Sequence, residues 1–193
     1  MKSLSLTAPH VVIMVGLPGA GKSFFAEHFS ETFSAPLVNW NSIRTQVFDH
    51  PTYSKEEDAI VKRIADYTLN ELFKTQATLL YEGDTLTQAS RQALARTVRD
   101  AGYEPLFVWV QTDVTSARAR AIKQGVSPDY YDASKKRFTP LKDSDPYVVI
   151  SGKHTYASQL KIVLRKLSSA RATAVEESAR TPKVTSNRRV RIQ

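Results

Sequence analysis

Residues 11–23 read VVIMVGLPGAGKS, so an apolar and largely β-branched run passes directly into a glycine-rich stretch. From Gly16 to Ser23 the stretch matches G-x-x-x-x-G-K-[ST] in full. Glycines at these places let the backbone curl so that successive N–H groups point inward, and a helix that starts at the lysine adds the positive end of its dipole. Such a turn between a buried strand and a helix is typical of a phosphate-binding loop, and it predicts an α/β fold.

The loop motif suggests a role for each of its residues. Lys22 is expected to act in catalysis by reaching the β and γ phosphates of a nucleotide, and the Ser23 hydroxyl is expected to ligate Mg²⁺. The alternative is a chance glycine-rich turn, but the preceding strand, the lysine and the serine all favour the phosphate loop. The residues expected to contact the nucleotide are Gly16, Pro18, Gly19, Ala20, Gly21, Lys22, Ser23 and Phe24.

Further short apolar runs and helical patterns alternate along the chain. The nearly continuous apolar runs predict strands covered on both faces, at residues 11–16, 36–40, 78–83, 105–110 and 147–151. Helical periodicity fills most of the gaps, and SKEE at residues 54–57 has the form of a capping box. The pattern predicts a mainly parallel five-stranded sheet with helices on both faces. Residues 126–146, rich in Pro, Asp and Lys, are predicted to form a loop.

The positive charge is concentrated at the end of the chain. Residues 1–160 carry 18 Lys and Arg against 17 Asp and Glu, whereas residues 161–193 carry 9 against 2. We therefore expect one domain over residues 1–167, closed by a helix from Tyr156 to Leu167, and a flexible basic tail over residues 168–193. The tail is either an arm that attracts nucleic acid or a solvated terminus, and the lack of interleaved aromatic residues favours the second.

Composition excludes several classes of protein and site. The chain has no cysteine, which excludes disulfides and thiolate metal sites, and its four histidines are not at ligand spacing, so a metal would need oxygen ligands. The apolar run near the amino terminus is too short to span a bilayer. We expect a cytoplasmic protein without a membrane partner.

Three further blocks follow the phosphate loop: NWNSIR at residues 39–44, TLLYEGDTLT at 78–87 and TSARARAIKQG at 115–125. With the loop they resemble the AAA-33 type of P-loop kinases over about residues 10–167, a pattern close to polynucleotide 5′-kinases and more distantly similar to zeta-toxin-type kinases. The resemblance implies a P-loop NTPase fold that uses ATP and Mg²⁺ to phosphorylate an acceptor hydroxyl, with a polynucleotide 5′-hydroxyl as one candidate. The alternatives are a small-molecule or nucleotide-sugar kinase and a nucleotide-binding or RNA-binding module that has lost catalysis.

The resemblance implies that the second block binds the acceptor. In the family pattern an Asp takes the acceptor proton, and an Arg three residues later orients the acceptor. Here the pair is Asn41 and Arg44. Because an amide does not accept a proton at neutral pH, either another carboxylate such as Asp84 or Asp49 serves, or no strong base is needed, or the acceptor chemistry has changed.

The last two blocks supply a carboxylate and a cation. Asp84 is the expected catalytic carboxylate and Mg²⁺ ligand, with Glu82 as second choice, and helix capping is the alternative role for both. Arg118 and Arg120 point about 200° apart on a helix, so they cannot share one task. The resemblance favours Arg120 as the lid residue at the transferring phosphoryl group and places Arg118 toward the adenine or the helix surface. A solvated basic helix face is the alternative.

Overall fold

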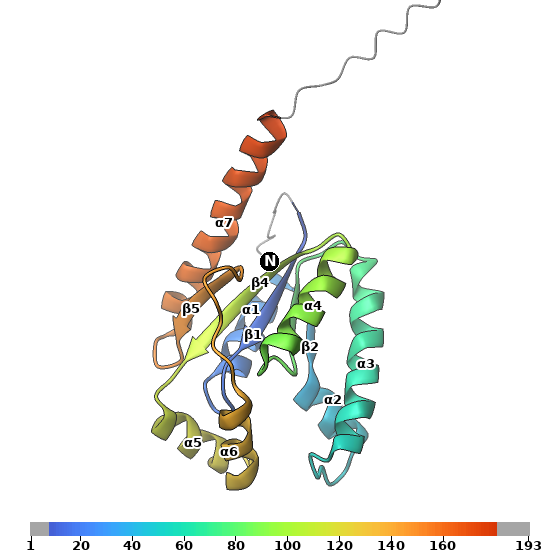
Figure 1. The fold of residues 1–193 in the computed structure, drawn as a ribbon, viewed down its shortest axis with the longest axis vertical. Coiled ribbons are helices and arrows are strands. Elements are labelled where there is room, and N and C mark those ends of the chain that lie inside the picture. Colours follow the sequence, from blue (N-terminus) through green and yellow to red (C-terminus); the bar gives the residue numbers. More distant parts are fainter. Residues whose placement is uncertain (1–7, 181–193) are drawn as a thin grey trace, which may run out of the picture.

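A computed structural model describes residues 8–180, with side chains up to Ser168. A single sheet of five parallel strands forms its centre, in the order β2-β3-β1-β4-β5 (Figure 1). All five predicted strands are confirmed, with ends shifted by at most one residue: β1 (His10–Val15), β2 (Leu37–Asn39), β3 (Leu79–Glu82), β4 (Glu104–Gln111) and β5 (Tyr147–Ser151). The predicted α/β fold with a parallel five-stranded sheet is thus confirmed.

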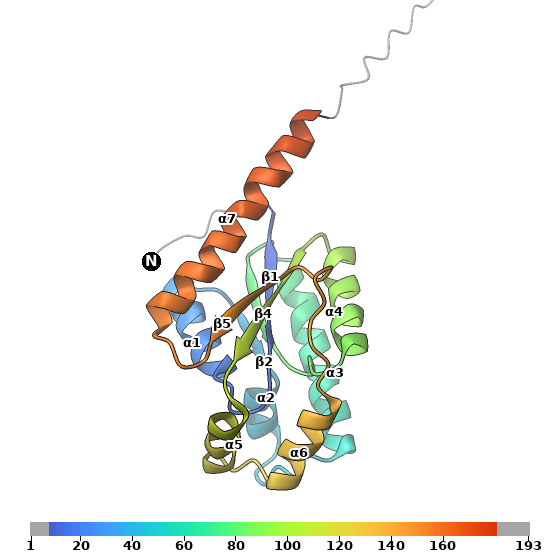
Figure 2. The ribbon, with the colours of Figure 1, turned by 60° about the vertical axis from the view of Figure 1, so that its left-hand side comes forward.

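Helices connect the successive strands, a last helix follows the last strand, and helices cover both faces of the sheet (Figure 2). The structure gives the bounds as α1 (Lys22–Phe33), α2 (Trp40–Val47), α3 (Lys55–Phe73), α4 (Gln88–Asp100), α5 (Val114–Lys123), α6 (Pro128–Arg137) and α7 (Tyr156–Arg180). Helix α3 begins at the predicted capping box, where the Ser54 hydroxyl accepts a hydrogen bond from the Glu57 backbone N–H.

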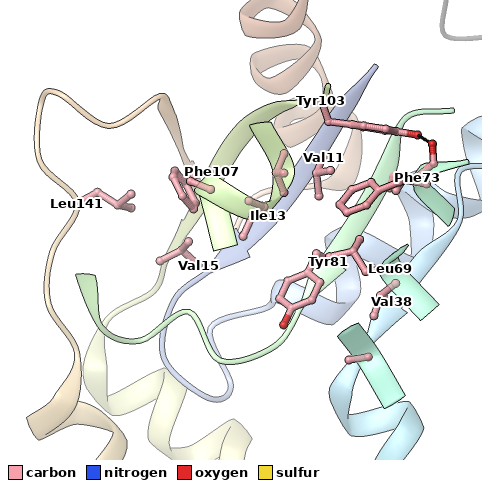
Figure 3. Close-up of a cluster of buried hydrophobic side chains, with 14 residues drawn as sticks. Val11, Ile13, Val15, Val38, Leu69, Phe73, Tyr81, Tyr103, Phe107 and Leu141 are labelled. Carbon is pink, nitrogen blue, oxygen red and sulfur yellow. Dashed lines mark hydrogen bonds between the residues drawn. The ribbon is translucent and has the colours of Figure 1, made fainter. Parts of the chain in front are cut away.

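Two apolar cores lie on the two faces of the sheet. Alternate residues of β1 point to opposite sides, so that Val11 and Ile13 pack with α3 and α4 while Val12 and Met14 pack with α1 and α7. Figure 3 shows the first core, where the Tyr103 hydroxyl also donates a hydrogen bond to the carbonyl of Phe73. With both faces covered, β1 is completely buried, and it therefore fixes the position of the loop that follows it.

The structure corrects two sequence expectations. Residues 126–146 are not all loop, since α6 occupies 128–137: the Ser127 hydroxyl caps it by accepting from the Tyr130 N–H, and Pro128 supplies the preset φ of a first helical turn. Helix α7 does not end at Leu167 but continues to Arg180, because residues 168–180 are rich in Ala, Glu and Arg and contain no Gly or Pro. Residues 181–193 of the predicted tail lie outside the described residues.

Among residues 8–180, no helix combines the length and the apolar character that crossing a bilayer would need.

Candidate active site

The carboxyl ends of the strands place the candidate residues along one edge of the sheet. Strand β1 lies between β3 and β4, so the loop after β1 is flanked by Glu82 at the end of β3 and by residues 111–113 after β4. The connection that leaves β1 runs to β2 on one side of it, and the connection that leaves β3 runs to β4 on the other side. Such a switch point is where open α/β sheets bind ligands.

The phosphate-binding loop curls tightly over residues 16–21. Gly19 has a φ of 73°, and a Cβ atom there would lie 2.1 Å from the carbonyl oxygen of Ala117 on α5. Only glycine fits this combination of left-handed backbone and close approach. The contact also brings α5, with its two arginines, directly against the loop.

Lys22 opens helix α1, and its side chain turns back along the loop. Its Nζ donates hydrogen bonds to the carbonyl oxygens of Gly16 at 3.1 Å and Leu17 at 3.0 Å. Burial lowers the pKa of Lys22, and the nearby charge of Glu82 opposes that shift. The ammonium group thus lies against the carbonyls of the glycine loop and is near enough to Glu82, at the end of β3, to be affected by its charge.

Glu82 is the carboxylate that meets the phosphate-binding loop. The Ser23 hydroxyl donates to Glu82 Oε1 at 2.9 Å, and the Asn39 side-chain amide donates to Glu82 Oε2 at 3.0 Å. Burial raises the pKa of Glu82, while the Lys22 charge and the Ser23 hydrogen bond lower it. Ser23, Lys22 and Glu82 therefore form one cluster of the kind of hydroxyl, ammonium and carboxylate that holds a Mg²⁺-bound phosphate chain.

Asp84, the first choice for this carboxylate, lies in the turn after β3. Its Oδ2 accepts a hydrogen bond from the Ser90 hydroxyl at 3.1 Å, and its Oδ1 is 3.8 Å from Arg137 Nη2 on α6. The structure thus places the second choice, Glu82, beside Ser23. What distinguishes the two carboxylates in the sequence is the end of the strand. Glu82 is the last residue of β3 and pairs in register with Asn39 of β2, whereas Asp84 lies beyond the strand.

The two arginines of α5 point in different directions and have different partners, which agrees with their spacing on a helix. Arg120 Nη1 donates to the carbonyl oxygen of Gly152 at 3.1 Å, and Gly152 lies so close to the loop that a Cβ on it would be 2.0 Å from the Ala20 oxygen. Arg118 Nε instead lies 3.6 Å from the Asp132 carboxylate on α6. Arg120 is the one held beside the phosphate-binding loop.

A cavity of about 430 Å³ opens between the loop and the ends of β4 and β5. Leu17 and Ala20 line one side, and Asp113 and Lys153 form a 2.6 Å ion pair on another. Phe24, half-exposed on α1, packs its ring against His28 with 4.4 Å between ring centroids rather than lining this cavity.

Arg44 is not free to orient an acceptor in this structure. Its side chain is 4% exposed and donates from Nη1 to Glu57 at 2.8 Å and from Nη2 to Asp58. The guanidinium also lies over the Tyr53 ring, 4.7 Å from its centroid. Arg44 joins α2 to α3, an arrangement that sequence spacing alone does not reveal.

Asn41 is exposed on the first turn of α2, and Tyr53 holds it. The Tyr53 hydroxyl donates to Asn41 Oδ1 at 3.2 Å, and the Tyr53 ring lies 5.4 Å from the ring of Tyr130 on α6. Tyr53 has a φ of 57°, unusual for a residue with a side chain. Residue spacing alone does not predict this contact between α2, the 50–53 turn and α6.

The comparisons with known proteins agree with this architecture. The AAA_33 family model, described as an AAA domain, matches residues 11–144. A sugar kinase from Janibacter sp. HTCC2649, solved without ligand, is 14% identical with a TM-score of 0.62, covering 86% of this chain and 97% of its own. A gluconokinase from Sinorhizobium meliloti 1021 is 14% identical with a TM-score of 0.62, covering 88% of this chain and 98% of its own. These likenesses show a shared fold.

Among curated proteins, the 6-phosphofructo-2-kinase/fructose-2,6-bisphosphatase 1 of Bos taurus is 24% identical over 156 residues. The match covers 67% of this chain and 31% of that protein, so the chain spans about a third of the length of the curated relative it matches. Together with the phosphate-binding loop on a parallel five-stranded sheet, the family match shows that the chain belongs to the AAA_33 family and has a kinase-like P-loop fold.

Proposed function

We propose that this chain is an ATP-dependent kinase that phosphorylates a hydroxyl group of a small polyhydroxylated molecule. The observation that carries the proposal is the hydrogen bond between Ser23 and Glu82, with Lys22 beside it, at the end of β1. A loop that cradles phosphates and a carboxylate against its serine together form the apparatus for phosphoryl transfer. In the reaction the acceptor oxygen bonds to the γ phosphorus, the bond to the β-γ bridging oxygen breaks, and ADP and a proton are released.

The residues present suit Mg²⁺, since the donor set is a hydroxyl and a carboxylate. Ser23 and Glu82 would hold the ion, which neutralises charge on the phosphates as they react. A cation there would also offset the burial that raises the pKa of Glu82. Asp84 is the second candidate for this task, and substitution of each carboxylate separates the two.

Lys22 and Arg120 would act on the phosphates from two sides. Lys22 belongs to the loop itself, and Arg120 is held by Gly152 next to Ala20. A cation on each side stabilises the charge of the transferring group without moving at the moment of reaction. Arg118, paired with Asp132, would support the lid formed by α5 and α6 and would not touch the phosphates.

Asn41 would position the acceptor without removing its proton. Because its Oδ1 accepts from Tyr53, its NH₂ group is left to donate to an acceptor oxygen. Transfer through a loose transition state needs little help from a base, so we expect Asn41→Asp to change kcat by less than about tenfold. Steady-state kinetics of Asn41→Asp and of Tyr53→Phe test this. A gain of about a hundredfold or more in Asn41→Asp would instead support a catalytic function lost at this position.

Two observations support a small acceptor. The names of the structural relatives specify a sugar kinase and a gluconokinase, and the curated relative carries a 6-phosphofructo-2-kinase in its name. Residues 1–160 also have nearly balanced charge, which gives the body of the domain no general attraction for a polyanion.

A polynucleotide 5′-hydroxyl is the second candidate acceptor. The observation that favours it is the excess of nine Lys and Arg over two Glu in residues 161–193. The experiment that decides offers γ-labelled ATP with Mg²⁺, sugars, sugar acids and polyols in one set of reactions, and 5′-hydroxyl DNA and RNA oligonucleotides in another. Lys22→Ala is the control, because label that depends on Lys22 reports transfer at the phosphate-binding loop.

A further inference from the structure

A second cavity, of about 380 Å³, lies away from the phosphate-binding loop on the α4 face of the sheet. Helix α4 forms one wall, and residues 144–146, which lead from α6 into β5, form the other. Figure 2 shows this segment running beside α4. We call the cavity the α4 groove, and its principal lining residues are Arg91, Arg96, Arg99, Phe107, Asp145 and Pro146.

The α4 groove is positively charged and has an apolar floor. Arg96 and Arg99 are exposed, and in the part of the chain with described side chains neither belongs to an ion pair. Asp145 is the single carboxylate of the lining, and its Oδ2 accepts from the Lys142 N–H. Phe107 is buried below. Three guanidinium groups against one carboxylate leave the groove with an excess of two positive charges.

Arg91 adds a fixed charge at the bottom of the groove. It is 2% exposed, and its guanidinium donates to the backbone carbonyls of Thr85 at 2.9 Å, Leu86 at 3.0 Å and Thr139 at 2.9 Å. These partners are neutral, so the contacts satisfy the hydrogen bonds of Arg91 without pairing its charge with a carboxylate at hydrogen-bond distance. Burial lowers the pKa of Arg91, and the charge of Asp145 raises it. An anion in the groove would stabilise this charge.

The sequence of α4 puts the polar lining on one face. Gln88, Gln92 and Arg99 recur at intervals of four and seven residues, so they share a stripe with Arg91 and Arg96 that faces the groove. The glutamine amides supply neutral hydrogen-bond donors and acceptors between the guanidinium groups. The face therefore offers both charge for an anion and partners for hydroxyl groups.

We propose that the α4 groove binds a small organic phosphate, with Arg96 and Arg99 on the phosphate group and the glutamines and Asp145 on its hydroxyl groups. Guanidinium groups suit phosphate because they donate two parallel hydrogen bonds. A cavity of about 380 Å³ is near the lower end of the range for small-molecule sites, which fits a sugar phosphate or a mononucleotide. Asp145 disfavours a polyanion that would run through the groove.

Ligand in the groove would act on the candidate active site through Arg91. The carbonyls that Arg91 holds belong to the turn just after Glu82 and Asp84 and to the segment just after α6. A ligand that attracts the Arg91 guanidinium would weaken its hydrogen bonds to these carbonyls, and so would change how firmly the turn after β3 and the segment after α6 are held. This regulatory consequence rests on the proposed kinase function, whereas binding in the groove does not.

Binding is tested on the full chain by NMR, with the phosphate-binding loop saturated with ADP and Mg²⁺. The probes are glucose 6-phosphate, glycerol 3-phosphate and AMP, with glucose and inorganic phosphate as references and a single-stranded DNA oligonucleotide as the competing polyanion. At least one organic phosphate is expected to shift the amides of residues 88–99 and 144–145 in a saturable way, and to bind more tightly than both references. The double variant Arg96→Gln/Arg99→Gln should weaken its binding at least about tenfold. Arg63→Gln, which removes an exposed arginine from α3, should leave it within about twofold.

Four results would overturn the proposal. The first is the absence of saturable shifts in these segments with all three organic phosphates. The second is binding that the double variant leaves unchanged. The third is inorganic phosphate that binds as well as the organic compounds, which would indicate an adventitious ion only. The fourth is a single-stranded oligonucleotide that shifts the same amides and binds more tightly, which would make the groove a nucleic-acid surface. Because ADP is present throughout and no turnover is measured, these results do not depend on kinase activity.

Discussion

Glu82 closes β3 with one carboxylate oxygen on Ser23 and the other on Asn39. We expect Glu82→Gln to lower kcat by about a hundredfold or more, because the amide keeps the shape and loses the charge that would hold Mg²⁺. Nucleotide binding measured without metal should stay within a few fold of that of the unmodified chain. The matched control is Asp84→Asn, whose partners are Ser90 and Arg137, and its loss should stay below about tenfold. A larger fall in kcat in Asp84→Asn than in Glu82→Gln would instead assign Asp84 as the carboxylate that holds the metal.

Glu57 makes the stability of the α2–α3 corner depend on pH. Hydrogen bonds from the Thr52 hydroxyl and backbone, from Arg44 and from the Tyr53 N–H lower the pKa of Glu57 from 4.5 to about 2. Since the folded-state pKa is the lower one, the stabilisation is present above pH 4.5 and is lost as the pH falls toward 2. Glu57→Gln should be less stable than the unmodified chain at neutral pH. It should also lose less stability between about pH 5 and pH 2, as measured by urea unfolding. Parallel curves for the two proteins would contradict this role.

At the scale of elements, α5 carries two arginines with different partners, the Gly152 carbonyl for Arg120 and Asp132 for Arg118. Arg120→Ala should reduce kcat by about ten- to a hundredfold with little change in the free energy of unfolding, because Arg120 is exposed and lies beside the loop. Arg118→Ala, two residues earlier on the same helix, is the matched control, and its loss of kcat should stay within about threefold. Equal losses in both variants would show that α5 acts only as a basic surface.

How well an element can be predicted depends on whether its residues act locally. The capping box at Ser54 and the parallel strands follow from local pattern and were predicted. Helix α6 was missed although Ser127 and Pro128 are a helix-start signal, because Pro, Asp and Lys in the same stretch also fit a loop. Whether Glu82 or Asp84 meets Ser23 depends on where β3 ends relative to β1 and β2, and that is a matter of sheet register.

At the scale of the whole molecule, the parallel sheet brings distant segments to one edge. The motif at residues 16–23 predicted this arrangement, because a phosphate-binding loop requires a buried strand before it and a helix after it. The partners of Arg44 could not be predicted in the same way, since Glu57 and Asp58 reach it only through the packing of α2 on α3. A residue buried by tertiary contacts can have the same spacing in the sequence as one that faces a ligand.

The measurement that tests the central claim most directly is the Lys22-dependent transfer of labelled γ-phosphate from ATP and Mg²⁺ to an acceptor. We expect label on a small polyhydroxylated compound. The rate of this transfer should fall by a factor of about a thousand in Lys22→Ala. Label that depends on Lys22 and appears only on oligonucleotides would support kinase activity but contradict the proposal of a small acceptor. Metal-dependent ATP binding without Lys22-dependent transfer to any compound of either set would contradict the kinase itself and leave a module that binds nucleotide.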